Sequence, residues 1–540
     1  MGKQLLFDAL MGKKTERTPW VPFVGCHGGA LIGKNAEEYL RSADLMVQGT
    51  KEAIRLYRPD GIPVMFDLQI EAEAMGCDLQ WAKDNPPAVI NHVLSNGRQL
   101  SDLAIPDENS GRIPAILQAI RTLKKETRDV ALYGLVTGPF TLALHLKGTD
   151  IFMDMFDYPD RVKELVLYAN EIAKKMAQMY IDAGCDIIAL VDPMTSQISP
   201  DAFREFVTPA ATNFFQEVRR LQAFSSFFVC GHAQKNIEAM CETRPDNVSI
   251  DENIPLDYVK TICQKFGISF GGNLQLTIVL LMGTEDDAKR NAIECIDVGG
   301  DTGYILAPGC DLPYAVPPAN LKAISELVHD PYKLDVAREL LDKSSIVETR
   351  INMADYGQAE KVIIDVITLD SEGCAPCQYM VEAVKSVAPL FSNLVIWREH
   401  KIKERESVEF MMGLMVKNIP TICIDGQIKF VSTIPSRDEL VKAIQDRINE
   451  KFFMKLRSHH GRLLVLGDGC ETCAQAWENV QQAAKELGSL VEIIHIKDEK
   501  EIYKYGVAST PAIIAVEQTV KSVGRVPSVE VIKEWLKNLE

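Results

Sequence analysis

This chain of 540 residues lacks long apolar runs, a secretory signal and an excess of positive charge, and each absence argues against one class of protein. No uninterrupted apolar run approaches the roughly 20 residues that a membrane helix needs, so we expect no membrane span. The start of the chain lacks the apolar core and cleavage site of a secretory signal, which favours a cytoplasmic location. The chain also has fewer basic residues than acidic ones, 58 against 75, and its formal net charge is −17. This balance argues against a nucleic-acid partner, since binding a phosphate backbone needs concentrated positive charge.

Cysteine, in contrast, is plentiful, with 13 in the chain. Without an export signal, so many cysteines favour reduced thiols, metal ligands or redox pairs over a structural disulfide framework. Four of them form two Cys-x-x-Cys pairs near the C-terminus, Cys374 with Cys377 and Cys470 with Cys473. Five others lie in or beside predicted helices and are assigned to packing: Cys77, Cys185, Cys241, Cys263 and Cys295.

Residues 1–335 alternate short apolar runs with amphipathic stretches, which is typical of repeated βα units and a parallel sheet. None of the predicted strands shows long polar alternation, so both faces of the sheet should be buried. Eight strands with helical connections favour a closed (β/α)8 TIM barrel over an open sheet. The predicted strands are residues 20–24, 61–66, 130–136, 186–191, 224–229, 247–250, 268–271 and 303–307.

Sulfur and imidazole groups follow two of these strands. In such a barrel, residues just past the carboxyl end of a strand face the active-site mouth. Cys230 and His232 follow the strand 224–229, and Cys310 follows the strand 303–307. Two thiols and an imidazole on one rim match the ligands of a catalytic zinc ion that keeps one position open. The alternative is that both cysteines are small buried hydrophobes, which is the usual role of an isolated cysteine.

Several short phrases in the barrel segment carry a family resemblance: EAEAMGC at 71–77, GPFT at 138–141, DP at 192–193, GNL at 272–274 and APGC at 307–310. With these phrases, residues 1–335 resemble the uroporphyrinogen decarboxylase superfamily, and within it the cobalamin-dependent methyltransferases that act on methylcorrinoid proteins. The resemblance implies that a methyl group moves between a corrinoid protein and a thiol-type or other small acceptor. It also implies a zinc ion that converts the acceptor thiol to a thiolate.

The zinc pattern of these methyltransferases is His-x-Cys at one strand end and a distant cysteine at another. This sequence keeps Cys230 and Cys310 but has Phe228 at the histidine position, so His232 or the Cys26–His27 pair is expected to supply the third ligand. Glu71 is expected to be a further ligand or a base. The resemblance assigns binding of substrate or corrinoid to three residues at other strand ends, His27, Asp192 and Asn273.

Beyond residue 335 the repeated βα pattern of the barrel ends. We interpret 336–358 as a linker, 359–450 as a small α/β domain with the CAPC pair Cys374/Cys377, and 460–540 as a second one with the CETC pair Cys470/Cys473. Both resemble thioredoxin and glutaredoxin. A thiol at a helix N-terminus has a stabilised thiolate, and the second cysteine one turn later closes a disulfide. The prolines Pro420 and Pro511 are expected to be cis. Zinc binding in a knuckle is the alternative for the four thiols.

Two classes of function remain open. The leading hypothesis is a corrinoid-dependent methyltransferase with a corrinoid protein and a small methyl donor or acceptor as partners. The alternative is a thiol–disulfide oxidoreductase whose barrel only binds a ligand or partner, with catalysis at Cys374 and Cys470. A decarboxylase variant is the weaker third option, because residues 25–31 contain no arginine to bind substrate carboxylates. A thioredoxin-type redox partner and a homodimer are further expectations.

Overall fold

A computed structural model describes most of the chain: residues 2–95, 97–340, 356, 361–372, 374–414, 416, 418–457, 462–467, 469–489, 491–507, 509–515, 520–523 and 526–537. It divides into two compact units, Met1–Leu440 and Val441–Glu540. The first unit holds the barrel and one thioredoxin-like domain, and the second holds the other thioredoxin-like domain. Among the described residues, no helix has both the length and the apolar character needed to cross a membrane.

The barrel is built on one sheet of seven parallel strands in the order β1-β4-β5-β6-β7-β8-β9. All of its strands are almost completely buried, as expected for a sheet covered on both faces. Two strands, β6 and β7, have the bounds that the sequence predicts, and the others shift by a few residues. The strands are β1 (Gly61–Pro63), β4 (Ala131–Thr137), β5 (Ile187–Val191), β6 (Phe224–Val229), β7 (Asn247–Ile250), β8 (Ser269–Leu274) and β9 (Tyr304–Pro308).

The first of the eight predicted strands, residues 20–24, is not a regular strand. It is reduced to a single parallel bridge between Trp20 and Leu306. On one side Val21 N donates to Leu306 O at 3.0 Å, and on the other Asp60 N donates to Trp20 O at 2.9 Å. The ladder stops there because Pro22 has no N–H to continue it. This short segment therefore lies between β9 and the start of β1, in the place of the missing strand.

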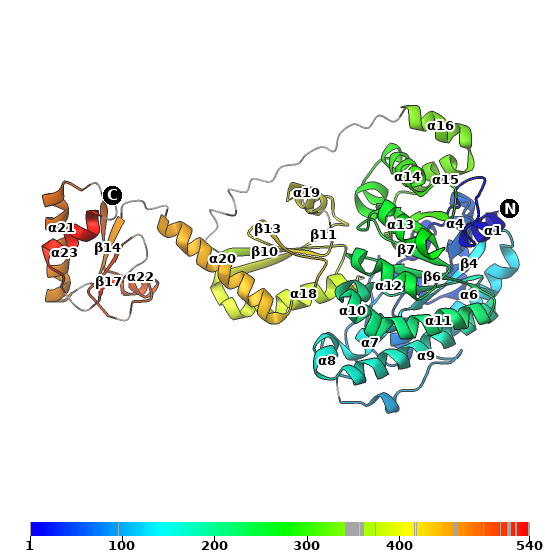
Figure 1. Ribbon diagram of the computed structural model, residues 1–540, viewed down its shortest axis with the longest axis horizontal. Helices are drawn as coiled ribbons and strands as arrows, with labels where there is room; N and C mark the ends of the chain where they lie inside the picture. Colours follow the sequence, from blue (N-terminus) through cyan, green and yellow to red (C-terminus); the bar gives the residue numbers. More distant parts are fainter. Residues whose placement is uncertain are drawn as a thin grey trace. The chain divides into compact units, whose positions relative to one another are not determined.

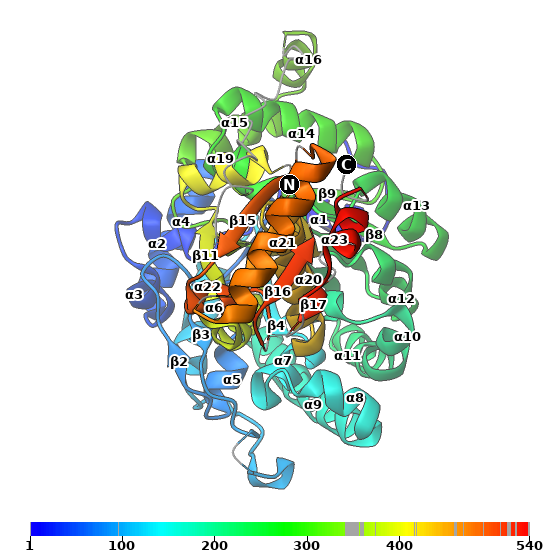
Figure 2. The ribbon, with the colours of Figure 1, turned by 90° about the vertical axis from the view of Figure 1, so that its left-hand side faces the viewer.

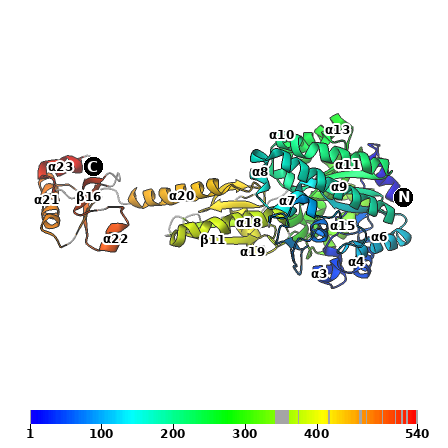
Figure 3. The same cartoon turned by 90° about the horizontal axis from the view of Figure 1, so that it is seen from below.

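Helices surround the sheet, in a ring that includes α4, α9, α11, α13, α14 and α15 (Figure 2). α9 and α11 lie side by side on the outside of the barrel (Figures 1 and 3). Residues 36–57 form two helices, α3 and α4, and Ser42 caps the second by accepting from Leu45 N. The main helices are α1 (Gly2–Leu10), α3 (Ala36–Leu40), α4 (Ala43–Tyr57), α5 (Ile70–Ala74), α6 (Ile113–Glu126), α7 (Pro139–Lys147), α9 (Pro159–Ala183), α11 (Thr208–Arg220), α12 (Ile237–Glu242), α13 (Leu256–Phe266), α14 (Glu285–Gly299), α15 (Pro318–His329) and α16 (Pro331–Leu340).

A four-stranded sheet in the order β11-β10-β12-β13 forms the first thioredoxin-like domain. The CAPC pair stands where β10 passes into α18, and the peptide bond before Pro420 is cis as expected. Most of the predicted linker 336–358 lies outside the described residues, although α16 continues to Leu340. The elements of the domain are β10 (Val362–Thr368), α18 (Ala375–Val387), β11 (Val395–Lys401), α19 (Arg405–Gly413), β12 (Thr421–Ile424), β13 (Gln427–Val431) and α20 (Arg437–Arg457).

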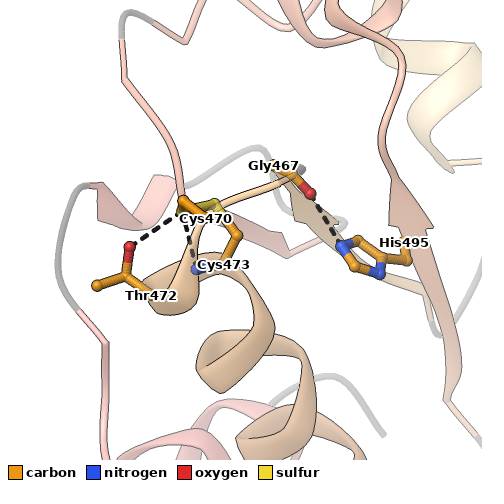
Figure 4. The surroundings of a disulfide bond; sticks show 5 residues. All are labelled: Gly467, Cys470, Thr472, Cys473 and His495. Carbon is orange, nitrogen blue, oxygen red and sulfur yellow. Dashed lines mark hydrogen bonds between the residues drawn. A yellow bond between two sulfur atoms is a disulfide. The ribbon is translucent and has the colours of Figure 1, made fainter.

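The second thioredoxin-like domain repeats this plan with the sheet order β15-β14-β16-β17. Cys470 and Cys473 at the start of α21 form a disulfide, and Cys470 Sγ lies 3.1 Å from Thr472 Oγ1 (Figure 4). The peptide bond before Pro511 is cis. The predicted fold class, a TIM-like barrel followed by two thioredoxin-like domains, is therefore confirmed. The elements are β14 (Arg462–Leu466), α21 (Glu471–Leu487), β15 (Glu492–Ile496), α22 (Glu499–Tyr503), β16 (Ala512–Ala515), β17 (Val520–Val523) and α23 (Val529–Lys537).

Candidate active site

A cavity of about 180 Å³ lies at the carboxyl ends of the barrel strands. This is the end of a parallel barrel at which active sites are built. Residues that follow β6, β7 and β9 line one part of it, including Cys230, Asp251 and Cys310. The CAPC segment of the first thioredoxin-like domain lines another part, with Cys374 and Cys377. The cavity therefore belongs to both domains of the first unit.

The two barrel thiols meet at this cavity. Cys230 follows β6 directly and Cys310 lies two residues after β9, and their Sγ atoms are 3.4 Å apart. Both residues are half-buried. The hydrogen bond to Cys310, followed by burial, raises the pKa of the Cys230 thiol well above its usual range. The Cys230 thiol therefore stays protonated beside Cys310.

The expected third zinc ligand does not join this pair. The ring of His232 is exposed, and its Nδ1 lies 3.3 Å from Asn418 Nδ2. His27 is buried with its two ring nitrogens 2.7 Å from Tyr57 Oη and 3.0 Å from Tyr314 O. In the described part of the chain, no three His, Cys, Asp or Glu side chains converge to hold a metal ion. The residues present thus supply two sulfur ligands but not the predicted three-ligand zinc site.

The replacement at position 228 has a visible consequence. The Phe228 ring is 2% exposed and lies inside the barrel, where it packs edge-on against Phe23 and Phe66 at centroid distances of 5.4 and 6.0 Å. An aromatic cluster therefore occupies the barrel interior under the cysteine pair, at the place where the methyltransferase pattern has a histidine.

Glu71, Asp192 and Asn273 lie near the mouth but outside the cavity lining. Both oxygens of Asp192 accept hydrogen bonds at the start of α7, from Phe140 N at 3.1 Å and from Thr141 N at 2.8 Å. Asn273 donates to Ile254 O at 2.9 Å. Their polar atoms hold backbone segments in place, and their predicted role in binding substrate or corrinoid stays a prediction.

Glu71 is also fully engaged with the fold. Its Oε1 accepts from Thr137 N at 3.0 Å and its Oε2 lies 2.6 Å from Thr137 Oγ1. Burial raises the pKa of Glu71 to about 7, against the opposing effect of these hydrogen bonds. The carboxyl group stabilises the end of β4 beside the mouth rather than facing the cavity.

Two acidic residues in the cavity were not assigned a role from the sequence. Asp251 and Glu252 follow β7 directly, and that position at a strand end was the available signal. Asp251 accepts from Gly231 N at 2.6 Å and from Asn253 Nδ2 at 2.7 Å. Glu252 accepts from Leu276 N through Oε1, whereas its buried Oε2 has no hydrogen-bond partner among the described residues.

The pKa of Glu252 is also shifted mainly by burial. Burial, and then the neighbouring charge of Asp251, raise the pKa of Glu252 above its usual range. Burial likewise raises the pKa of Asp251. The close approach of Glu252 depends on Gly309, because a Cβ there would lie 2.1 Å from Glu252 Oε2. Glu252 thus lines the cavity, and its unpartnered Oε2 atom is buried close to Gly309.

Acidic side chains outnumber basic ones in the lining of the cavity. Six carboxyl groups line it, whereas its only lysine, Lys403, pairs with Asp370 at 2.6 Å, and no arginine is among the described lining residues. A polyanionic porphyrinogen would therefore meet no unpaired basic side chain among the described lining residues. This disfavours the decarboxylase alternative. The carboxyl groups are those of Asp67, Asp84, Asp251, Glu252, Asp311 and Asp370.

The CAPC pair has an unexpected environment. Cys374 precedes α18, and Cys377 is fully buried. We expected the helix N-terminus to stabilise the Cys374 thiolate. Instead, the hydrogen bond to Cys377 and the burial of Cys374 at the cavity raise the pKa of Cys374 well above its usual range. The hydrogen bond within the dithiol and the burial of Cys374 thus keep this thiol protonated.

Comparison with known families and proteins assigns the domains. The uroporphyrinogen decarboxylase (URO-D) model matches residues 1–331, and the thioredoxin domain model matches 362–445 and 462–537. A methylcobamide:CoM methyltransferase MtbA of Methanosarcina mazei is 26% identical over 334 residues, which cover 60% of this chain and 96% of the relative. MtaA of Methanosarcina barkeri, another methylcobamide:CoM methyltransferase, is 29% identical over 337 residues, with coverage of 60% and 96%.

Decarboxylases and a solved structure are also similar to the chain. A uroporphyrinogen decarboxylase of Anaeromyxobacter sp. is 26% identical over 306 residues, covering 54% of this chain and 86% of the relative. A methyltransferase structure from Methanosarcina mazei superposes with a TM-score of 0.57 at 25% identity, and covers 61% of this chain and 99% of that one. Since the family model spans more than half of the residues, the chain belongs to the uroporphyrinogen decarboxylase (URO-D) family and carries thioredoxin domains after the family domain.

Proposed function

We propose that this protein is a corrinoid-dependent methyltransferase that moves a methyl group between a methylcorrinoid protein and a small thiol bound in the cavity. The observation that carries the proposal is the cavity itself, which places Cys230, Cys310 and Glu252 at the carboxyl ends of the strands. Relatives with the same barrel are named methylcobamide:CoM methyltransferases. The arginine-free lining disfavours the decarboxylase alternative.

The charges of the cavity favour an acceptor without negative charge. An anionic group would approach six carboxyl groups and a lysine that is already paired with Asp370. Placing a further anion in a buried acidic site is costly because no opposite charge compensates for its lost hydration. We therefore infer that the acceptor is a small neutral or cationic thiol.

Glu252 is the residue best placed to accept the proton of this thiol. A general base must reach the proton directly and must have a pKa near the working pH. The Oε2 atom of Glu252 is unpartnered among the described residues, and its pKa is raised toward neutrality by burial. As the proton moves to Glu252, the sulfur lone pair forms the S–CH₃ bond. The Co–C bond breaks at the same time, and its electron pair stays on the cobalt of the substrate corrinoid.

Zinc stays a prediction from the sequence. A zinc ion would polarise the acceptor thiol, but catalytic zinc in proteins has three protein ligands. Cys230 and Cys310 are two such ligands, and among the described residues no third one converges with them. The proton transfer above therefore uses only groups that the chain supplies.

The proposal is tested by the demethylation of methylcobalamin in the presence of thiols, followed by its visible spectrum. We expect a faster reaction with neutral 2-mercaptoethanol than with anionic coenzyme M. Glu252→Gln should lower the rate by about 100-fold, the usual contribution of a general base. The matched control is Glu238→Gln, because Glu238 is exposed on α12, away from the cavity. An unchanged rate in Glu252→Gln would exclude Glu252 as the base, and absence of thiol-dependent demethylation would contradict methyl transfer.

The second candidate function is that of a thiol–disulfide oxidoreductase. The observation that favours it is the position of Cys374 at the cavity, next to two further thiols. Reduction of insulin disulfides by a chain without methyltransferase activity would support it. A homodimer and an external redox partner stay predictions from the sequence.

A further inference from the structure

Five cysteines line one cavity, Cys26 and two further pairs of thiols. The Sγ atoms of Cys230 and Cys310 are in contact at 3.4 Å on the barrel side. Cys374 and Cys377 line the same cavity from the thioredoxin-like side. Cys374 is close enough that its charge is among the causes that raise the pKa of Cys230. No comparable grouping of thiols occurs elsewhere among the described residues.

The thioredoxin-like domain presents its reactive face to the barrel. In this fold the dithiol and the cis-proline segment form the surface that binds a disulfide substrate, with a free backbone edge beside the proline. Pro420 lines the cavity together with Cys374. The barrel side of the cavity therefore takes the position that a disulfide substrate would occupy.

Specific contacts hold the domain in this position. Asn85 Nδ2 donates to Asp370 Oδ2 at 2.5 Å, and Gln378 Nε2 donates to Val89 O at 2.8 Å. Gln197 donates to Ser432 O at 2.7 Å, on the other side of the cavity. The ring of Tyr379, in α18, is buried within the hydrophobic core of the barrel. Polar contacts on two sides and a buried aromatic anchor fix the orientation of the CAPC pair.

A second pair of barrel cysteines shows what a packing pair looks like. The Sγ atoms of Cys241 and Cys263 are 3.8 Å apart, and both side chains are fully buried between α12 and α13. Neither residue lines the cavity. The Cys230–Cys310 pair differs because it is half-buried and faces a dithiol. It also lacks a converging third metal ligand among the described residues.

We propose that the CAPC dithiol reduces a disulfide between Cys230 and Cys310 of the same chain. Cys374 sulfur attacks one sulfur of the Cys230–Cys310 bond, which forms a mixed disulfide and releases the other barrel thiol. Cys377 then attacks Cys374, closes the Cys374–Cys377 disulfide and frees the second barrel thiol. Two electrons and two protons pass from the CAPC pair to the barrel pair. A cellular dithiol then reduces the CAPC disulfide again.

This exchange gives the appended domain a substrate within its own chain. Its consequence is that the mouth thiols return to the reduced state after oxidation, without an encounter with a second protein. The proposal does not depend on methyl transfer, because the disulfides themselves are measured.

The first test uses the full chain with Cys377→Ser, which removes the thiol that resolves the mixed disulfide. After mild oxidation with diamide, peptide mapping under non-reducing conditions should find Cys374 linked to Cys230 or Cys310 in most chains. Adding Cys230→Ser and Cys310→Ser should abolish that link. A link to Cys241 or Cys263 instead, or the absence of any link to the barrel, would overturn the proposal.

The second test uses the unaltered chain, so it does not depend on the stability of a variant. Protein with an oxidised barrel pair receives one equivalent of dithiothreitol, and loss of the Cys230–Cys310 disulfide is followed by rapid alkylation and mass spectrometry. Once dithiothreitol has reduced the CAPC pair, the mixture is diluted tenfold. We expect the rate at which the barrel disulfide is then lost to stay unchanged, because the exchange is intramolecular. Cys374→Ser should slow the reaction by about tenfold or more. Equal rates in the two chains, or failure of the barrel disulfide to form, would refute it.

Discussion

At the scale of single residues, Glu71 illustrates how burial sets protonation beside the mouth. Thr137 Oγ1 lies 2.6 Å from Glu71 Oε2 and 2.8 Å from Leu68 O. One hydroxyl hydrogen cannot serve two acceptors, whereas a protonated Glu71 can donate to Thr137, which then donates to Leu68 O. This chain of hydrogen bonds agrees with a pKa of about 7 for Glu71. A neutral carboxyl group therefore suits this site.

Glu71→Gln should consequently change the pH dependence of stability. The folded pKa of Glu71 is raised from 4.5 to about 7. Its contribution to stability is therefore complete below about pH 4.5 and is lost as pH rises toward and through 7. Glutamine resembles the protonated carboxyl group. We therefore expect the free energy of unfolding of Glu71→Gln, relative to that of the natural chain, to rise by up to about 3 kcal/mol between pH 5 and 8. Urea unfolding at each pH measures this difference, and a constant difference across that range would contradict it.

The site residues show what a sequence can predict at this scale. The position of Cys230 and Cys310 at strand ends was sufficient to place both sulfurs at the mouth. The same reasoning put Glu71, Asp192 and Asn273 on the rim, but their polar atoms bond to the fold instead of facing the cavity. A position at a strand end predicts that a residue lies on the rim of the barrel. It does not predict whether the side chain points into the cavity. Hydrogen bonds to distant backbone groups decide that, and they have no local sequence signal.

At the scale of elements, strands with continuous apolar runs were the most predictable. β6 and β7 have the predicted bounds because both faces are buried and turns follow at once. Residues 20–24 were also apolar, yet Pro22 reduces that strand to one bridge at Trp20. Docking of α18 against the barrel was not predictable, because its partner surface lies almost 300 residues earlier in the chain.

Tyr379 is the side chain by which α18 is anchored in the barrel. It is 2% exposed and stacks on His92 with ring centroids 6.2 Å apart. Truncating a buried aromatic ring costs about 3–5 kcal/mol, so Tyr379→Ala should weaken docking of the domain. Each 1.4 kcal/mol is about tenfold in an equilibrium, so alkylation of Cys374 by iodoacetamide should become at least about tenfold faster.

The matched control for this prediction is Tyr503→Ala, since Tyr503 is 70% exposed in the second thioredoxin-like domain. The reaction of Cys374 in that variant should equal the rate in the natural chain. An unchanged rate in Tyr379→Ala would mean that this ring does not hold the CAPC pair against the barrel.

At the scale of the whole first unit, the two activities proposed for the cavity exclude each other in time. The docked CAPC domain leaves about 180 Å³ at the mouth, which is room for a small ligand. A corrin macrocycle with its side chains is far larger than this cavity. We therefore predict that methyl transfer from a corrinoid requires the thioredoxin-like domain to leave the mouth, whereas the proposed thiol exchange requires it to be docked. On this prediction, the redox state of the mouth and the access of the corrinoid are coupled through one domain contact.

A covalent tether between the domains tests this coupling. Asn418 and His232 face each other across the contact, with Nδ2 and Nδ1 3.3 Å apart. In a chain with both Asn418→Cys and His232→Cys, oxidation should join the domains. Demethylation of methylcobalamin should then fall by about tenfold or more beyond any effect of oxidation on the natural chain, because the tether opposes undocking. Dithiothreitol should restore the rate. The single variant Asn418→Cys, treated in the same way, controls for oxidation of the native thiols. Full activity of the tethered chain would show that the corrinoid reaches the mouth while the domain stays docked, and the two activities would then be independent.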